Sequence, residues 1–254
     1  MRFPAPTTDT LATRAKIGMV VPSTNTTVQP EYESMRPQGV TNHVARMLLP
    51  PRPYDDMAVY KQALETEKGE LDEALELVLN CEPHVIAHGH SIHSFRGTIE
   101  TARAEVVRLE AFCERPFMTP SMSVIKGLEA IGRPRRIGVL TPYWPPAGEM
   151  VANFFRSAGY EPVSVVNMQT KGPTNVAKIP YADTLAAFAQ LDRPDVEAFV
   201  HVGTALPLTA ITEQIENTYG KPLIGVNVAT YWAALRAAGV NDRIRGFGRL
   251  LAAC

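Results

Sequence analysis

The chain has 254 residues and a formal net charge of −1, with 25 Lys and Arg against 26 Asp and Glu. This balance argues against a nucleic-acid partner, and no run approaches the ~20 apolar residues of a membrane span. The segment from Met1 to Thr13 lacks the basic-then-apolar pattern of a signal peptide. Cys81, Cys113 and Cys254 show no metal-ligand or disulfide spacing, so we expect a protein of the reducing cytoplasm.

The first half of the chain alternates short apolar runs with segments of helical periodicity. From the N-terminus we expect a strand at 16–21, a second at 44–49, a helix at 54–79, a strand at 84–89, a helix at 99–112, a strand at 117–120 and a helix at 124–131. Short continuous apolar runs are typical of strands that a parallel sheet buries on both faces.

The second half repeats this alternation. We expect strands at 136–140, 162–167, 198–202 and 223–226, and helices at 148–158, 184–191, 208–218 and 230–238. A loop that holds Gly172, Pro173 and Asn175 precedes the 184–191 helix. Strands that alternate with helices predict a parallel sheet with right-handed crossovers in each half, so the fold class is α/β.

Three segments of the first half return in the second half in the same order. Residues 17–23 (IGMVVPS) return as 137–143 (IGVLTPY), 84–91 (HVIAHGHS) as 197–204 (EAFVHVGT), and 115–132 as 221–239. We therefore predict two similar lobes, with the active site in the cleft between them. The first lobe comprises 1–118 plus 226–254 and the second 119–225, because the last repeated segment is expected to pack back on the first lobe.

The loop at 22–27 (PSTNTT) brings hydroxyls and one amide to the end of the first strand. Such a loop can cap its own helix, or it can bind a carboxylate, since the free N–H groups of a helix start favour anions. It lacks the glycines and the lysine of a phosphate-binding P-loop. The candidate substrate-binding residues here are Ser23, Asn25 and Thr26.

Three of the six histidines lie within residues 88–93. In an extended strand end, His88 and His90 share one side, and His201 in the repeated strand could complete a metal site with them. No Asp or Glu lies beside the cluster, and a histidine that acts as general acid or base in the cleft is the better-supported interpretation. The third interpretation is that these histidines hydrogen-bond neighbouring loops.

Two positions of the second half mirror these strand ends. Tyr143 is either a packed aromatic residue or a hydroxyl donor aimed into the cleft. Gly203, followed by Thr204, either permits a tight turn or lets a substrate approach backbone amides closely.

Together these residues resemble the maleate isomerase and arylmalonate decarboxylase branch of the aspartate/glutamate racemase superfamily. Residues 16–27 are similar to its opening strand and loop, 137–143 to its second-lobe strand, and 220–239 to its closing strand and helix. The resemblance implies two Rossmann-like lobes related by a pseudo-twofold axis, with no cofactor and with the substrate between them. It also implies that Asn25, Tyr143 and Asn175 bind the substrate carboxylate.

The chain departs from that family where the reactive cysteines are expected. The positions that the resemblance assigns to these cysteines hold His90 and Gly203, while Cys81, Cys113 and Cys254 lie elsewhere. Addition of a thiolate to an alkene and two-thiol racemisation both lose their nucleophile.

We therefore expect a cofactor-independent lyase that decarboxylates a small carboxylic or dicarboxylic acid, or eliminates a group from it, through an enolate-like intermediate. The expected catalytic residues are His90, Tyr143 and His201, and the expected substrate-binding residues are Ser23, Asn25, Thr26, Ser91, Asn175, Gly203 and Thr204. Three alternatives stay open: a maleate-isomerase-like cis–trans or other proton-transfer isomerase, a non-catalytic carboxylate-binding protein, and a metal enzyme using His88, His90 and His201. We also expect a homo-oligomer with a small-molecule substrate and no membrane or nucleic-acid partner.

Overall fold

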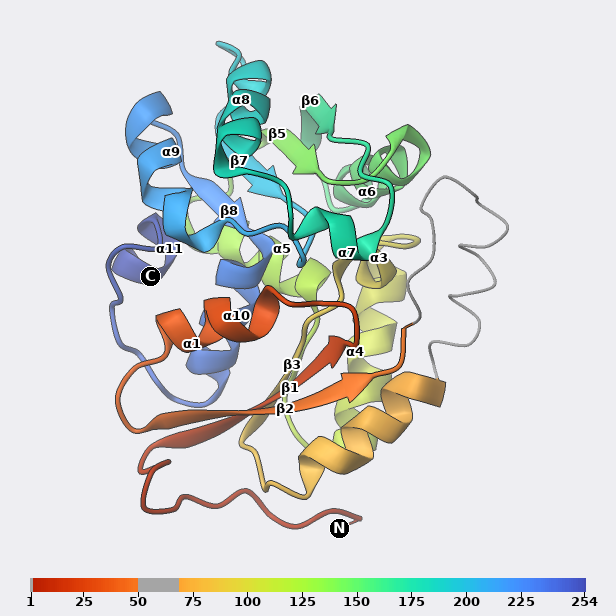
Figure 1. Ribbon diagram of the computed structural model, residues 1–254, viewed down its shortest axis with the longest axis vertical. Helices are drawn as coiled ribbons and strands as arrows, with labels where there is room; N and C mark the ends of the chain where they lie inside the picture. Colours follow the sequence, from red (N-terminus) through yellow and green to blue (C-terminus); the bar gives the residue numbers. More distant parts are fainter. Residues whose placement is uncertain (1, 50–68) are drawn as a thin grey trace.

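The computed structural model, shown in Figure 1, describes residues 2–49 and 69–254. Its strands form two separate four-stranded sheets, with orders β2-β1-β3-β4 and β6-β5-β7-β8, and every pairing within them is parallel. The two orders are equivalent position by position, as expected for a duplicated unit. The predicted α/β class with a parallel sheet in each half is confirmed.

The first sheet is built from β1 (Ala15–Pro22), β2 (Val40–Met47), β3 (Val85–His88) and β4 (Phe117–Met118). All eight residues of β1 are buried, which explains the apolar run that follows Lys16. The edge strand β2 begins four residues before its predicted start at 44, because its polar residues 41–43 hide the strand pattern. The helices of the first half are α1 (Val28–Met35), a helix at 69–79, α3 (Ser91–Ser94) and α4 (Ile99–Cys113). The rest of the helix predicted at 54–79 lies outside the described residues.

The second sheet is built from β5 (Arg136–Thr141), β6 (Glu161–Asn167), β7 (Ala198–His201) and β8 (Leu223–Gly225). Its helices are α6 (Pro145–Ser157), α7 (Pro173–Val176), α8 (Tyr181–Leu191) and α9 (Thr212–Tyr219), the last preceded by a 3₁₀ turn at Thr209–Ile211. The loop predicted at 172–175 contains the short α7, and α6 begins three residues before its predicted start at 148 because a proline is favoured in the first helical turn.

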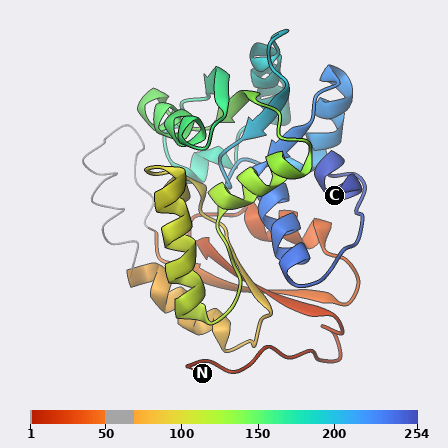
Figure 2. The same ribbon diagram turned by 180° about the vertical axis from the view of Figure 1, so that it is seen from behind.

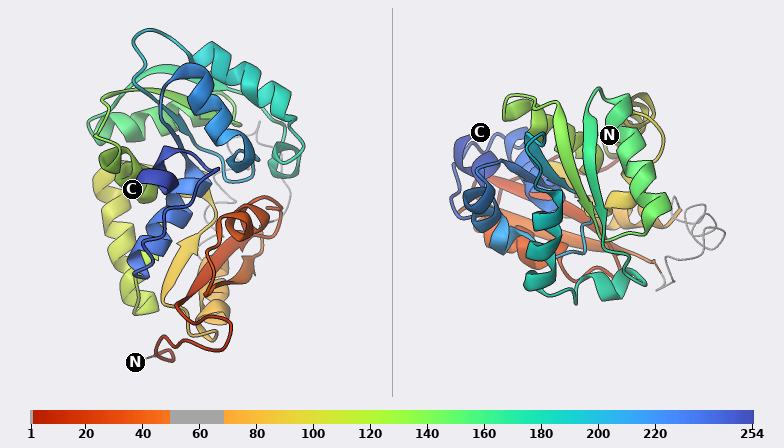
Figure 3. Two further views of the ribbon diagram at one scale, coloured as in Figure 1. Left: turned by 90° about the vertical axis from the view of Figure 1, so that its left-hand side faces the viewer. Right: turned by 90° about the horizontal axis from the view of Figure 1, so that it is seen from above.

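Two helices join the halves by crossing between them. Helix α10 (Val226–Ala237) follows β8 but packs against β3 and α1, whereas α5 (Pro120–Ala130) follows β4 but packs against β8. A Cβ atom at Gly127 of α5 would lie 3.2 Å from Ile224 of β8, so this glycine permits the close approach. Figure 2 and the left-hand view of Figure 3 show α10 running from the second sheet down beside the first, with α11 (Arg249–Ala253) near its upper end. This exchange fixes the two sheets against one another.

Within residues 2–49 and 69–254, no helix combines the length and the apolar character needed to cross a membrane.

Candidate active site

A narrow pocket lies where the carboxyl ends of the strands in the two sheets face each other. From the first half it is lined by Pro22, Thr24, Asn25, Leu49 and His90, and from the second by Pro142, Tyr143, Pro173, Val176, Gly203, Thr204 and Ala205. The open volume of the pocket is about 20 Å³, which is room for about one water molecule. The walls are therefore closed on one another, and a substrate of several carbon atoms requires them to part.

Ser91 connects the two halves beside this pocket, through two residues that line it. Its hydroxyl lies 2.8 Å from the hydroxyl of Tyr143, and it accepts a hydrogen bond of 3.1 Å from the backbone N–H of Thr204. Burial raises the pKa of Tyr143, so the phenol keeps its proton at neutral pH and is able to donate a hydrogen bond. Two hydroxyls and one amide thus form a continuous chain of hydrogen-bonding groups, drawn from the segments that follow β3, β5 and β7.

His90 stands at the point where β3 gives way to α3. Its backbone is extended and it is the N-cap residue of α3, so the strand delivers its side chain to the pocket while Ser91 begins the helix. The residue is 9% exposed. The His90 ring meets the His88 ring edge to face, with centroids 6.1 Å apart. The His90 imidazole therefore lies in the same pocket as Tyr143 and Thr204.

Asn25 has a structural task as well as a place in the pocket. Its Oδ1 accepts hydrogen bonds from the backbone N–H groups of Thr27 and Val28 at the start of α1, at 2.9 and 3.0 Å. Its Nδ2 donates to the Thr204 hydroxyl at 3.3 Å, across the two halves. The capping and the ligand-binding interpretations of this loop therefore meet in one side chain, because the cap uses the carbonyl oxygen and leaves the NH₂ group directed across the cleft.

Glu31, which the sequence analysis does not single out, lies behind this pocket. Its carboxylate accepts hydrogen bonds from the backbone N–H groups of Leu208 and Thr209, at 2.7 and 3.0 Å, and from Asn227 Nδ2 at 2.6 Å. Asn227 also donates to the carbonyl oxygen of Thr204 at 2.9 Å. Burial raises the pKa of Glu31 above its ordinary value. In the sequence it looks like a solvated residue of a first helical turn, and only docking of the second half buries it.

Four predicted substrate-binding residues lie outside the pocket lining: Ser91, which bonds two residues of that lining, and Ser23, Thr26 and Asn175. Ser23 is exposed and exchanges hydrogen bonds with the backbone of Leu49, and Thr26 is exposed on a different surface depression. Asn175 is exposed on α7 and accepts a hydrogen bond of 3.5 Å from Lys178. The pocket instead receives Thr24, Pro173 and Val176 from the same two segments. The structure thus brings Asn25 and Tyr143 together, and a role for Asn175 stays a prediction.

The two predicted second-half positions differ in their access to the pocket. His201 is 1% exposed within β7 and does not line the pocket. Burial lowers the pKa of His201 to about 3, so its imidazole is neutral at physiological pH. Gly203 does line the pocket, and a Cβ atom there would lie 2.6 Å from Cγ of Pro142. The glycine is therefore required by the packing of two backbone segments.

The described residues contain no group of three His, Cys, Asp or Glu side chains close enough to hold a metal ion. His88, His90 and His201 are accordingly not assembled as a metal site. Cysteine is also missing from the described pocket lining. Cys113 is buried, and burial raises the pKa of its thiol to about 12, which keeps it protonated and unreactive.

The fold and the pocket define a two-lobed α/β protein whose candidate site lies between the carboxyl ends of two mirrored parallel sheets. A family model described as arylmalonate decarboxylase matches residues 17–251. The chain belongs to this family, within the isomerase and lyase group of the aspartate/glutamate racemase superfamily, and the enzyme class predicted from the sequence is confirmed.

Relatives named as maleate isomerases match nearly the whole chain. The maleate isomerase of Pseudomonas putida (strain KT2440) is 26% identical, over 93% of this chain and 96% of that protein. A cysteine-to-serine mutant of the Nocardia farcinica maleate cis–trans isomerase, solved with a covalently bound succinylcysteine intermediate, superposes with a TM-score of 0.82 at 24% identity, covering 94% of this chain and 98% of that one. Arylmalonate decarboxylase superposes with a TM-score of 0.76 at 20% identity, covering 93% and 98%.

Proposed function

We propose that the protein is a cofactor-independent lyase that decarboxylates a small dicarboxylic acid, or eliminates a group beside its carboxylate, through an enolate-like intermediate. The observation that carries this proposal is that His90, Tyr143 and Thr204 line one pocket, while the Ser91 hydroxyl beside it bonds both the Tyr143 hydroxyl and the Thr204 N–H. This set supplies an acid or base and donors for a developing oxyanion, without a thiol.

The donors would act on the charge that forms during the reaction. When a carboxylate leaves as carbon dioxide, the electrons of the broken C–C bond pass into the remaining carboxyl group and make an enolate. Hydrogen bonds from the Tyr143 and Ser91 hydroxyls would stabilise its oxygen atoms, with the Thr204 N–H orienting Ser91, and loss of one such donor commonly costs about 10²–10³ in turnover. Burial strengthens these hydrogen bonds because the local dielectric is low.

His90 would complete the reaction by proton transfer. A protonated imidazole gives its proton to the carbon that lost the carboxyl group, and the neutral imidazole then takes up a proton from solvent. For an elimination the same nitrogen would first remove the proton beside the carboxylate. Neither route changes the oxidation state of the substrate or requires a cofactor.

A proton-transfer or cis–trans isomerase is the second candidate. It is supported by the maleate isomerase of Pseudomonas putida, which is 26% identical. The similar enzyme of Nocardia farcinica was solved with a succinylcysteine intermediate. This chain has His90 and Gly203 at the positions that the resemblance assigns to cysteine, so an isomerisation here would need a route without a thiol adduct. We therefore rank it below the lyase.

The test is turnover of a panel of substituted malonates, maleate and 2-hydroxydicarboxylates, with the products identified by NMR. Release of carbon dioxide or of a leaving group supports the lyase, and conversion of maleate to fumarate alone supports the isomerase. His90→Ala should lower turnover about 10²–10⁴-fold, as expected for a lost general acid or base, and should still bind the substrate. Absence of turnover together with tight carboxylate binding would favour the alternative that the protein is a non-catalytic carboxylate-binding protein.

Two control variants separate imidazole and thiol chemistry from loss of fold. His43 is a partly buried histidine of β2 that bonds Thr41 at 2.9 Å and lies outside the pocket lining, so His43→Ala should keep turnover. A variant with Cys81→Ser, Cys113→Ala and Cys254→Ser should also stay active. If the cysteine variant is folded but a thousandfold slower, the thiol-free mechanism is wrong.

A further inference from the structure

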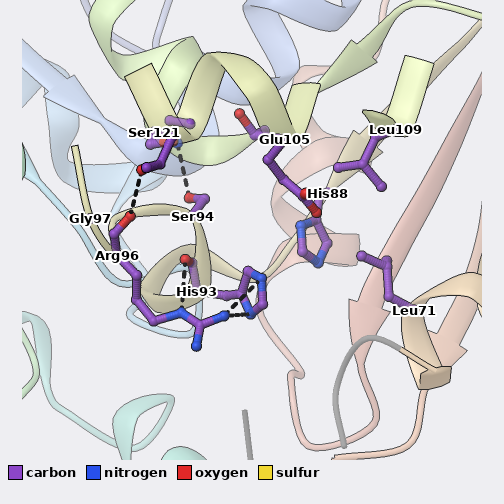
Figure 4. Close-up of a pocket in the computed structure, with 12 residues that line it drawn as sticks. Leu71, His88, His93, Ser94, Arg96, Gly97, Glu105, Leu109 and Ser121 are labelled. Atoms are coloured by element: carbon purple, nitrogen blue, oxygen red, sulfur yellow. Dashed lines mark hydrogen bonds between the residues drawn. The ribbon is translucent and has the colours of Figure 1, made fainter. Parts of the chain in front are cut away.

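A second pocket lies within the first half, on the side of β3 and β4 that faces α4. It encloses about 340 Å³, a volume typical of small-ligand pockets. Its described lining is Leu71, His88, His93, Ser94, Arg96, Gly97, Thr101, Ala102, Glu105, Leu109, Thr119 and Ser121. In Figure 4, Ser121, Ser94 and Arg96 lie along one side and Glu105, His88 and Leu71 along the other. None of these residues lines the cleft between the halves.

Two buried hydroxyls in this pocket have no hydrogen-bond partner among the described residues. Thr119 is 4% exposed and Ser121 is fully buried, and both hydroxyl oxygens are unpartnered. A buried hydroxyl without a partner is costly, and the cost disappears when a ligand accepts its hydrogen bond. The pocket floor therefore lacks an acceptor that a ligand can supply.

The same two residues begin a helix. Thr119 is the N-cap of the eleven-residue α5, but its side chain makes no capping hydrogen bond, and Ser121 lies in the first turn. The N-terminus of a helix carries a partial positive charge that favours anions. An N-cap hydroxyl that is not used for capping and faces a cavity is suited to donate to an anion placed there.

Charged side chains at the pocket are consistent with an anionic ligand. The guanidinium of Arg96 lies against the His93 ring, with Nη2 2.9 Å from Nδ1. The one carboxylate in the described lining, Glu105, is bonded at both oxygens by Arg108, at 2.7 and 2.9 Å. Arg96 thus adds positive charge, while the negative charge of Glu105 is compensated.

We propose that this pocket is a second binding site, which takes a small oxyanion such as a carboxylate or phosphate on Thr119, Ser121 and the start of α5. An occupant would also lie beside His88, whose ring contacts that of the cleft residue His90. The site is independent of the chemistry proposed for the cleft.

The experiment measures binding of malonate and of inorganic phosphate by calorimetry, with the complexes located in crystals soaked in each anion. Thr119→Val keeps the shape of the side chain and removes the hydroxyl, and should weaken binding at this pocket about tenfold or more. Ser91→Ala impairs the cleft alone and should leave this binding event unchanged. Thr218→Val, a matched change at an exposed helix position, controls for the substitution itself.

The outcomes separate the two sites and the two ligands. Density for either anion beside Thr119, with weaker binding by a folded Thr119→Val variant, supports the proposal. The anion that binds more tightly shows whether the pocket prefers a carboxylate or a phosphate. Binding that Ser91→Ala abolishes and Thr119→Val leaves intact overturns it, as does a pocket that stays empty in both soaks. A thermal melt that matches wild type shows that each variant is folded.

Discussion

Tyr143 illustrates how one side chain serves both halves, since it extends from the second half to the hydroxyl of Ser91 in the first. Burial raises its pKa, so its contribution is the donated proton and not charge. Tyr143→Phe removes that donor and keeps the ring. Turnover should fall about 10²–10³-fold with little change in stability. Steady-state kinetics check this, and Tyr160→Phe, at a buried tyrosine that packs on Phe155, is the matched control and should remain active.

Gly203 sets a limit on restoring a thiol to the second half. Gly203→Cys places a Cβ atom 2.6 Å from Cγ of Pro142, and such overpacking typically costs about 1–3 kcal/mol. We expect a lower free energy of unfolding in urea. Gly69→Cys, at an exposed helix position with no atom within 4 Å of an added Cβ, should cost nothing comparable. Wild-type stability in the Gly203→Cys variant would show that Pro142 yields without cost.

At the scale of the element, the loop before α1 combines helix capping with ligand binding. Asn25→Ala removes the oxygen that caps α1 and should lower the free energy of unfolding by about 1–2 kcal/mol. Asn25→Asp keeps that oxygen, and a carboxylate at a helix start is favourable, so its stability should stay near wild type. Both variants lose the NH₂ donor in the cleft, so both should bind a carboxylate more weakly. Calorimetry beside urea unfolding checks the pair, and unchanged affinity in Asn25→Asp would remove Asn25 from the binding site.

At the scale of the whole molecule, Glu31 ties α1 to residues 208–209 and to α10. Burial raises its pKa above 4.5. At pH values between 4.5 and the raised pKa, the folded state therefore holds a proton that the unfolded state has released. The stability contributed by this carboxyl is fully present below pH 4.5 and is lost as the pH rises through the raised value. Glu31→Gln has no such proton. The stability difference between wild type and Glu31→Gln should therefore shift against wild type as the pH rises from about 4.5 to 8.

Urea unfolding of both proteins across that range measures this difference. Glu216→Gln is a comparison at a second buried carboxyl whose pKa burial also raises, and it tests whether the effect belongs to Glu31. A difference that stays constant with pH would show that the pKa of Glu31 is not raised in the folded state. Glu31→Ala, which leaves three donors without an acceptor, should cost ~3 kcal/mol or more.

The sequence predicts the layers better than it predicts the cleft. Buried parallel strands such as β1 and β5 are continuous apolar runs, and the repeated order of those runs is enough to predict two equivalent sheets. Helices of four residues, such as α3 and α7, are too short to show a period. Glu31 could not be found because its burial depends on contacts between residues 177 or more positions apart. The exposure of Asn175 likewise depends on how α7 turns beside the cleft.

The unequal ends of β3 and β7 have a consequence for the handedness of the product. An imidazole follows β3, and a glycine held against Pro142 follows β7. A prochiral malonate bound between them would receive its new hydrogen from the His90 side alone. The resulting monoacid would then be a single enantiomer, and in deuterium oxide its label would occupy one stereochemical position. A duplicated scaffold with two similar faces would in this way deliver chiral chemistry from only one of them.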